Sequence, residues 1–328
     1  MSIIHVDSLS KHFNSIKAVD NVNFDVREGT IFGFLGPNGA GKTTTISILC
    51  TLLKPTSGTA IVDGYNCVTQ PAKVRRSIGV VFQDTTLDKD LTAYENLLYH
   101  AILYNVEKSE RQKLVDDALM FIGLYERKND LVKRFSGGMK RRLEVARAMV
   151  HQPKILFLDE PTLGLDPQSR NNLWEFITRL PEEKGVTIFM TTHYMDEAEV
   201  CDEIAIIDRG KIIARGSPEE LKKSVGGDVI YLKTTNNLKA LSIIREEMSL
   251  TGKIKGDELF ITVTRGDACL PELIRHLGDI VKSVRVQRPT LNDVFLNLTG
   301  KEIREETPDS MDEIKESVRA YRRRFDRT

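Results

Sequence analysis

The stretch FLGPNGAGKTTT, residues 34–45, joins an apolar run to a row of threonines through glycines, a proline and a lysine. Residues 30–35 are typical of a buried strand, and residues 42–49 are typical of a helix. The spacing Gly36-x4-Gly41-Lys42-Thr43 fits a P-loop, in which backbone N–H groups and a helix N-terminus converge on phosphate oxygens. A flexible glycine turn without a ligand is the alternative. We predict a nucleotide phosphate site made of Gly36, Pro37, Asn38, Gly39, Ala40, Gly41, Lys42, Thr43 and Thr44.

In such a loop, each residue type has its own chemical task. Glycine allows the backbone to approach the ligand, because a Cβ atom would keep it away. The side chain of Lys42 would reach the β- and γ-phosphates, and the hydroxyl of Thr43 would hold Mg²⁺. The motif therefore predicts both a nucleotide and a magnesium ion.

The bulk composition narrows the class of protein. The 328 residues are 41% hydrophobic, so the chain can bury a core, and two domains are the natural expectation at this length. Its 47 basic and 47 acidic residues balance, which gives no global electrostatic reason to expect nucleic acid. The four cysteines show no metal-binding spacing and suit a reducing cytosol. We expect no secretory signal and no membrane span, so any membrane role would come through a partner.

The hydrophobic pattern indicates two folded units and a charged tail. In residues 1–225, continuous apolar runs at 78–82, 155–158 and 186–190 predict a mostly parallel sheet core. Early alternating segments predict an antiparallel β subdomain, and the region between residues 90 and 150 predicts a helical subdomain. The pattern of residues 226–300 indicates the order strand, helix, strand, helix, strand and short helix, which predicts a small α+β domain. Residues 301–328 form an amphipathic helical pattern with a basic end.

A second motif is ILFLDEPTLGLDP, residues 155–167, where an apolar strand ends in two carboxylates. Ligands of open α/β sheets bind at the carboxyl ends of the strands. Asp159 could accept from Mg²⁺ or its waters, and Glu160 could take a proton from an attacking water. An acidic turn at the end of a strand, without catalytic role, is the alternative.

A third motif is FSGGMKRRLEVARA, residues 135–148, in which Ser136, Gly137 and Gly138 precede a helical run. A small capping residue followed by free N–H groups is a second possible anion site. For this motif alone, a simple helix cap is the better interpretation.

With these motifs in this order, residues 1–225 resemble the ATP-binding cassette (ABC) family of ATPases. The resemblance is greatest to the separate ATPase subunits of drug-resistance-type exporters. It implies that Phe13 stacks on adenine, Gln83 contacts Mg²⁺ or water, Asp166 belongs to the D-loop, and His193 contacts the γ-phosphate. Phe135 and Met139 depart from the usual signature residues Leu and Gln, but the Ser136 hydroxyl and the glycine donors remain. The implied catalytic residues are Lys42, Gln83, Glu160 and His193, and the implied metal-contacting residues are Thr43, Gln83 and Asp159.

The resemblance also implies how the protein works. Two subunits would meet head to tail around two ATP molecules, with Ser136 and Gly138 of one chain facing the P-loop of the other. A multi-spanning permease on separate chains would be the membrane partner, at the cytoplasmic face of the cell membrane. The expected function is ATP hydrolysis that powers export of a drug, lipid or polysaccharide. The alternative is a soluble ABC-type ATPase that acts on ribosomes or DNA. A GTPase is a third interpretation, but the chain lacks a guanine-binding Asn-Lys-x-Asp run.

Two further stretches point to the same exporter group. RPTLNDVFLNLTG, residues 288–300, resembles the tail domain of daunorubicin-resistance-type ATPases, and DTTLDKDLTAYENL, residues 84–97, is similar to the same group. The spacing of Leu291, Val294, Phe295 and Leu298 predicts one buried helix face in the small domain. For the tail, packing on its own C-terminal domain or exposure to solvent is the expectation, and docking on a partner or membrane surface is the weaker alternative.

Overall fold

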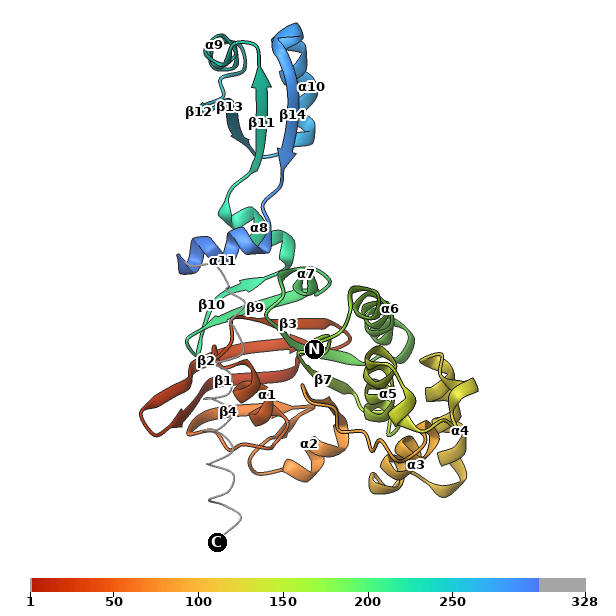
Figure 1. The fold of residues 1–328 in the computed structure, drawn as a ribbon. Coiled ribbons are helices and arrows are strands. Elements are labelled where there is room, and N and C mark those ends of the chain that lie inside the picture. Colours follow the sequence, from red (N-terminus) through yellow and green to blue (C-terminus); the bar gives the residue numbers. More distant parts are fainter. Residues whose placement is uncertain (1, 301–328) are drawn as a thin grey trace.

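The computed structural model describes residues 2–300 and centres on a six-stranded sheet with the order β10-β9-β3-β8-β7-β6 (Figure 1). Neighbouring strands are parallel except for β10, which runs antiparallel to β9. All residues of β3, β7 and β8 are buried, which explains their continuous apolar sequence. The strands are β3 (Ile31–Leu35), β6 (Ile78–Val81), β7 (Ile155–Asp159), β8 (Thr187–Thr192), β9 (Glu203–Asp208) and β10 (Lys211–Gly216).

A second, antiparallel sheet packs on the first around helix α1 (Lys42–Leu49). Its order is β2-β1-β4-β5, and α2 follows it in the chain. Five phenylalanines meet between the layers, with neighbouring ring centroids 5.4–5.9 Å apart. These elements are β1 (Ser2–Phe13), β2 (Ile16–Arg27), β4 (Ser57–Val62), β5 (Tyr65–Asn66) and α2 (Pro71–Ser77).

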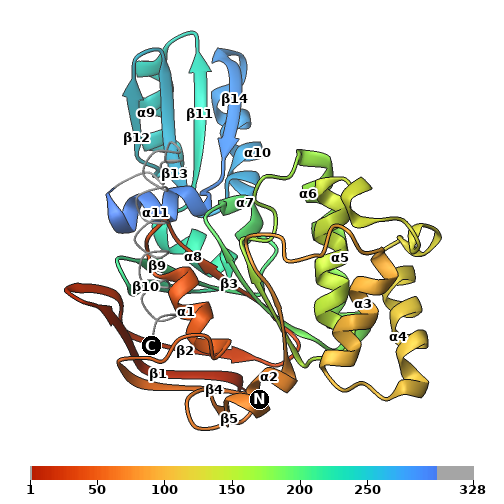
Figure 2. The same ribbon diagram turned by 60° about the horizontal axis from the view of Figure 1, so that its bottom comes forward.

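A helical lobe lies beside the central sheet (Figure 2), where its helix α5 contacts β6. Three of its helices begin with a side chain that caps the first turn: Thr92 caps α3, Ser136 caps α5 and Asp166 caps α6. Short 3-10 turns at Tyr125–Arg127 and Val132–Arg134 connect α4 to α5. The helices are α3 (Ala93–Leu103), α4 (Lys108–Phe121), α5 (Gly137–Met149) and α6 (Pro167–Lys184), with the short α7 (Met195–Ala198) after β8.

The small C-terminal unit projects from the large unit, residues 2–225, on the side away from α3 and α4 (Figure 1). Its elements follow in the order strand, helix, two strands, helix, strand, and its sheet has the order β12-β13-β11-β14. It has its own core, which includes Ile230, Ile244, Leu259 and Leu273. The elements are β11 (Asp228–Thr234), α9 (Asn237–Met248), β12 (Gly252–Lys255), β13 (Glu258–Val263), α10 (Gly266–Leu277), a 3-10 turn (Gly278–Ile280) and β14 (Val281–Gln287).

The sequence pattern placed the last helix, α11 (Leu291–Thr299), in the small domain. The helix instead packs outside this small core. It contacts α8 (Pro218–Val225) and α7, and its side chains Leu291, Val294 and Phe295 join the core cluster of the large unit. Leu298, expected on the buried face, is 44% exposed. Leu291, Val294 and Phe295 are therefore buried as predicted, but outside the small domain. The period of an apolar face predicts that a helix packs but not which neighbour it packs on.

Within residues 2–300, we find no helix that is both long and apolar enough to cross a membrane. The amphipathic pattern predicted for 301–328 lies outside the described residues.

Candidate active site

The predicted P-loop connects β3 to α1 at the carboxyl edge of the central sheet. Gly36 can only be glycine here, because an added Cβ would lie 2.2 Å from the carbonyl oxygen of Ile207. Gly41, with φ of 109°, caps α1 in a left-handed conformation, where a Cβ would lie 2.3 Å from the carbonyl oxygen of Ala18. In the described structure α1 has neither a side-chain cap nor an acidic residue in its first turn. Its first N–H groups are therefore available to an anion.

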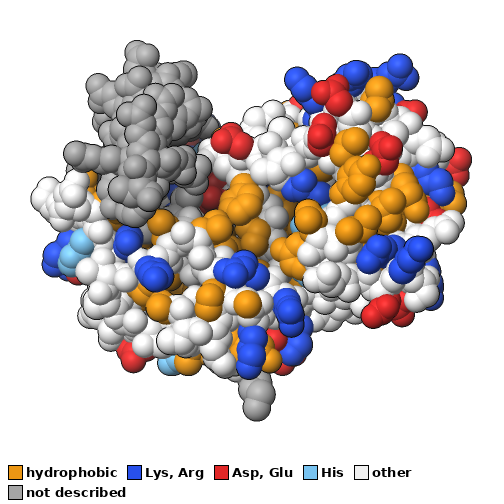
Figure 3. All heavy atoms as spheres, turned by 90° about the horizontal axis from the view of Figure 1, so that it is seen from below, with side chains coloured by type: hydrophobic (Ala, Val, Ile, Leu, Met, Phe, Trp, Pro, Cys, Tyr) orange, Lys and Arg blue, Asp and Glu red, His pale blue; other side chains and the backbone are white. Residues whose placement is uncertain are grey.

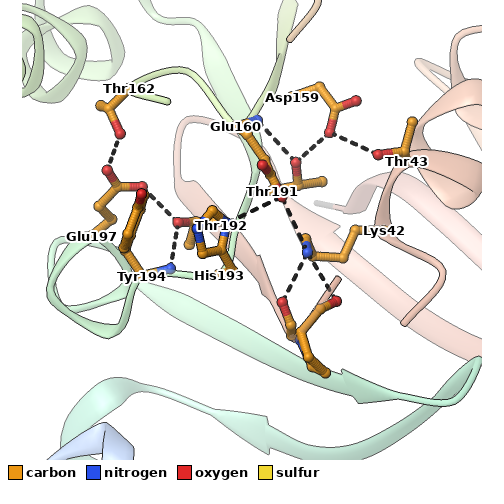
Figure 4. A network of polar contacts seen from close by, with 12 residues as sticks. Lys42, Thr43, Asp159, Glu160, Thr162, Thr191, Thr192, His193, Tyr194 and Glu197 are labelled. Atoms are coloured by element: carbon orange, nitrogen blue, oxygen red, sulfur yellow. Dashed lines mark hydrogen bonds and ion pairs between the residues drawn. The ribbon is translucent and has the colours of Figure 1, made fainter. Parts of the chain in front are cut away.

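Lys42 lies buried beneath this loop and is the cation of the site. Its Nζ donates to the carbonyl oxygens of Gly36 at 2.8 Å and Pro37 at 3.1 Å, and lies 3.2 Å from Glu160 Oε1 (Figure 4). Burial lowers the pKa of Lys42, and the nearby carboxylates of Glu160 and Asp159 only partly offset this effect. A buried ammonium held by carbonyl oxygens is in place to receive a phosphate.

Asp159, the last residue of β7, forms a pair of contacts suited to a divalent cation. Its Oδ1 accepts from the Thr191 hydroxyl at 2.5 Å and from the Thr43 hydroxyl at 3.4 Å. Burial raises the pKa of Asp159, and the hydrogen bond from Thr191 opposes this effect. Carboxylate and hydroxyl oxygens are hard donors of the kind Mg²⁺ prefers. The described residues at this point therefore fit the predicted ion.

Glu160 follows Asp159 with a left-handed backbone, φ 46°, which is strained for a residue with a side chain. Its N–H donates to the carbonyl oxygen of Thr191 at 3.2 Å and to the hydroxyl oxygen of Thr191 at 3.1 Å. The turn directs its carboxylate toward Lys42 and His193 (Figure 4). Burial alone would raise the pKa of Glu160, but His193 and the charge of Lys42 outweigh it and lower the pKa.

His193 lies directly after β8, with Nδ1 3.3 Å from Glu160 Oε1. The two groups are within ion-pair distance, although the contact does not have the geometry of a hydrogen bond. The ring also contacts Tyr194, with centroids 4.0 Å apart. Behind it, the buried carboxylate of Glu197 accepts from the hydroxyls of Thr192 and Thr162, and burial raises the pKa of Glu197. This network fixes the turn that carries His193.

The structure brings together the P-loop, Asp159, Glu160 and His193 but leaves other predicted residues apart. Ser136 caps α5, its Oγ accepting from the N–H of Met139 at 3.3 Å, and Gly138 packs against Ser169. Asp166 caps α6 by accepting from the N–H of Ser169 at 2.9 Å.

Two further predicted residues lie at the ends of strands. Gln83 follows β6 and, among the described residues, has no hydrogen bond to Lys42 or Asp159. Phe13 ends β1, with Lys11 Nζ 5.2 Å from its ring centroid. The binding roles of Ser136, Gly138, Asp166, Gln83 and Phe13 stay predictions.

Sequence reasoning did not single out Thr191, Glu197 or Arg141. Thr191 and Glu197 belong to TTHYMDEAE, the stretch that carries His193. Their closeness in sequence to a predicted site residue was the signal that could have identified them. Arg141 belongs to the run after SGG, where a buried guanidinium could not be told from a solvated one.

A P-loop whose lysine pairs with Glu160 and whose threonine contacts Asp159, at the carboxyl edge of a mostly parallel sheet, defines a P-loop nucleotide hydrolase of the α/β class. The family model for the ABC transporter matches residues 19–163, and the model for the C-terminal domain of DrrA1-3-like ATP-binding proteins matches residues 216–299. The linearmycin resistance ATP-binding protein LnrL of Bacillus subtilis (strain 168) is 37% identical over 313 residues, which cover 92% of this chain and 100% of LnrL. The daunorubicin/doxorubicin resistance ATP-binding protein DrrA of Streptomyces peucetius is 39% identical over 307 residues, which cover 90% of this chain and 92% of DrrA.

Among solved structures, the ATP-binding cassette MJ0796, in a dimeric post-hydrolysis state bound to ADP and Pi, aligns with a TM-score of 0.59 and 29% identity. The alignment covers 65% of this chain and 98% of that chain. The chain belongs to the ABC transporter ATP-binding protein family, in the group of DrrA-type drug-resistance ATPases. The predicted resemblance and fold class are thereby confirmed, as is the assignment as an ATP-binding, ATP-hydrolysing transporter subunit. The relatives give no support to the ribosome or DNA alternative.

Proposed function

We propose that this chain pairs head to tail with a second copy and that the pair powers an exporter by hydrolysing ATP. The observation that carries the proposal is the convergence of Lys42, Asp159, Glu160 and His193 at one edge of the central sheet. Each γ-phosphate would meet Lys42 and His193 of one chain and Ser136 and Gly138 of the other. Charge-assisted bonds to phosphate are strong, so ATP would hold the two chains together until hydrolysis.

Glu160 is the proposed general base. A base must be ionised at working pH and within reach of the attacking water. The lowered pKa of Glu160 satisfies the first condition, and its place between Lys42 and His193 supports the second. The reaction is ATP + H₂O → ADP + phosphate, in which Glu160 orients or deprotonates the water and the Lys42 ammonium stabilises phosphate charge. Thr43 and Asp159 would hold Mg²⁺, with Gln83 as a further proposed ligand, and the bound ion would neutralise charge on the phosphates.

A multi-spanning permease is the proposed partner, with this chain at the cytoplasmic face of the membrane. Figure 3 shows hydrophobic side chains gathered on the half of the molecule that the helical lobe occupies. On α3, Tyr99 is 49% exposed, Ile102 is 40% exposed and Leu103 is 77% exposed. Neighbouring exposed apolar side chains mark an interaction surface. The names of LnrL and DrrA, both resistance proteins, support export of a drug-like compound.

Purification of the tagged chain from membranes in mild detergent tests the partner directly. A multi-spanning protein in stoichiometric amount is the expected result and would also identify the chain that selects the cargo. Recovery without any membrane protein, with ATPase activity intact, would contradict the transporter partner and leave the ATPase chemistry standing.

The division into a cassette of residues 1–225, a domain of residues 226–300 and a tail of residues 301–328 is kept as a proposal, amended by the packing of α11. Helix α11 follows the small domain in the chain and packs on α8, which precedes that domain. The small domain is therefore inserted between two helices that both pack on the cassette. The two chain connections would limit movement of the small domain relative to the ATP site.

A further inference from the structure

Arg141 is a buried arginine in α5 whose guanidinium joins two segments of the active site. Its Nε donates to the carbonyl oxygen of Pro161 at 2.5 Å, and its Nη2 donates to those of Asp159 and Glu160, each at 3.3 Å. Its Nη1 donates to the carbonyl oxygen of Phe82 at 2.6 Å. One side chain therefore links the residue before Gln83 to the turn that contains the proposed base.

The contact with Glu160 acts on the strained part of its backbone. The N–H of Glu160 is held by Thr191, and its carbonyl oxygen accepts both from Arg141 Nη2 and from the N–H of Leu163 at 3.2 Å. With φ of 46°, the residue keeps this conformation only while its surroundings impose it. Movement of the guanidinium would therefore change where the Glu160 carboxylate points.

Glu144, one turn further along α5, connects the same guanidinium to the other side of Gln83. Its Oε2 lies 2.9 Å from Arg141 Nη1, and its Oε1 accepts from the N–H of Thr86 at 2.7 Å. Both side chains are almost fully buried, at 7% and 3% exposure. A buried ion pair is costly to break by removing one partner, so its two ends are expected to move together.

The segment after Gln83 is in turn tied to α3. Asn96 of α3 donates to the carbonyl oxygen of Asp88 at 2.9 Å, and its Oδ1 accepts from the N–H of Asp88 at 2.9 Å. Hydrogen bonds thus run from α3, through residues 82–88 and the Arg141–Glu144 pair, to the backbone of Glu160.

We propose that Arg141 and Glu144 are positioning residues that link the segment around Gln83 to the Glu160 carboxylate, so that a displacement at α3 alters hydrolysis. Arg141 offers a planar fork with five N–H donors, whereas lysine has three donors on a flexible stem. Arg141→Lys keeps the charge and the pair with Glu144 but cannot hold all the carbonyl oxygens. The proposal rests on the proposed role of Glu160 as the base.

A double-mutant cycle tests it. Arg141→Lys should lower kcat for ATP hydrolysis by about 10- to 100-fold, because misplacing a catalytic group has effects of this size. The Kd for ATP should change by less than about threefold, since no P-loop contact is lost. In a Glu160→Gln background the same substitution should change the slow residual hydrolysis by less than about twofold, because the group that it positions is absent. Single-turnover assays with labelled ATP measure both rates.

Arg142→Lys is the matched control. Arg142 is the next residue of α5, and its Nη1 donates to the carbonyl oxygen of Ile122, away from the ATP site. This variant should keep the wild-type kcat. If Arg141→Lys does not fold, Glu144→Gln replaces it, and it should lower kcat by at least about threefold with the same loss of effect in the Glu160→Gln background.

Three results would overturn the proposal: wild-type kcat in Arg141→Lys, an equal fall in rate in both backgrounds, or weakened ATP binding with unchanged kcat. A separate failure is distinguishable from these. If Glu160→Gln alone hydrolyses ATP at the normal rate, the assignment of the base is wrong, whatever the effect of Arg141→Lys.

Discussion

Lys42 Nζ lies 3.2 Å from Glu160 Oε1, and the two side chains are 4% and 10% exposed. The pair joins the residue that should bind phosphate to the residue that should activate water. A γ-phosphate would compete with Glu160 for the ammonium, because Lys42 also donates to two carbonyl oxygens of its own loop. The proposed base is held in an ion pair in this structure, and a phosphate that took over the ammonium would leave its carboxylate available for water.

Replacing Thr191 with valine tests the support of Asp159. The substitution removes the hydroxyl that donates to Asp159 Oδ1 at 2.5 Å and accepts from the N–H of Glu160. We expect a loss of about 1–3 kcal/mol of unfolding free energy, since a buried carboxylate loses a partner. We also expect a rise of about tenfold in the Mg²⁺ concentration that gives half-maximal ATPase activity, because residues that orient a metal ligand have effects of this size.

Thr187→Val is its matched control. Thr187 is also buried in β8, and its hydroxyl oxygen accepts from the N–H of Gly29 at 2.9 Å, at the other end of the strand. Denaturant unfolding should show a loss of stability in both variants, with altered Mg²⁺ dependence in Thr191→Val alone. An unchanged Mg²⁺ dependence in Thr191→Val would remove Thr191 from the account of the metal site.

Glu197→Gln should change how stability depends on pH. Burial raises the pKa of Glu197 in the folded chain, so the folded state binds the proton more tightly than the unfolded state. The more tightly bound proton stabilises the folded chain, and this stabilisation is complete below the unfolded pKa. It is lost as pH rises through the folded pKa, and the free energy of unfolding then falls by at most about 1.4 kcal/mol per pH unit. Glutamine removes it while still offering hydrogen-bonding groups to Thr192 and Thr162.

Thermal unfolding without nucleotide, from pH 4.5 to pH 8, measures this effect. The stability of Glu197→Gln relative to the unsubstituted chain should rise with pH until Glu197 is fully ionised. Parallel stability curves across the whole range would show that the carboxyl titrates alike in the folded and unfolded states.

Leu103→Glu should separate permease binding from ATPase chemistry. Leu103 is 77% exposed on α3, so the substitution should change folding stability by less than about 0.5 kcal/mol. A buried charge at a protein interface is costly, and co-purification of the membrane protein should fall at least about tenfold. Leu238→Glu is the control, because Leu238 is 72% exposed on α9 of the small domain. Equal co-purification with both variants would exclude α3 as the docking surface.

Local sequence was sufficient to predict the elements around the P-loop. Helix α1 begins at Lys42 as expected, because a glycine turn followed by residues of helical period leaves few alternatives. The strands β3, β7 and β8 could be recognised because a strand buried on both faces is apolar throughout. Parallel strands present their carboxyl ends at one edge, so the placement of Asp159 and Glu160 at the ligand-binding edge of the sheet also followed from the motifs.

Contacts between distant segments were beyond this kind of prediction. The bonds from Arg141 to Phe82 and Pro161 join residues 59 and 20 positions away, and no local pattern marks them. The packing of α11 on α8 was missed for the same reason, because its apolar face would fit either domain. The short strand β12 is four residues long and lacks an alternating apolar pattern, so it carried no recognisable signal.

The most direct test of the central claim is the ATPase rate of Glu160→Gln, measured together with its oligomeric state with and without ATP. Glutamine fills the same space but cannot accept the proton from water, so kcat should fall at least about 100-fold, the usual contribution of a general base. ATP should still bind and should now hold the chain as a stable dimer, seen by light scattering. Hydrolysis at the normal rate, or a chain that stays monomeric with ATP bound, would contradict the account.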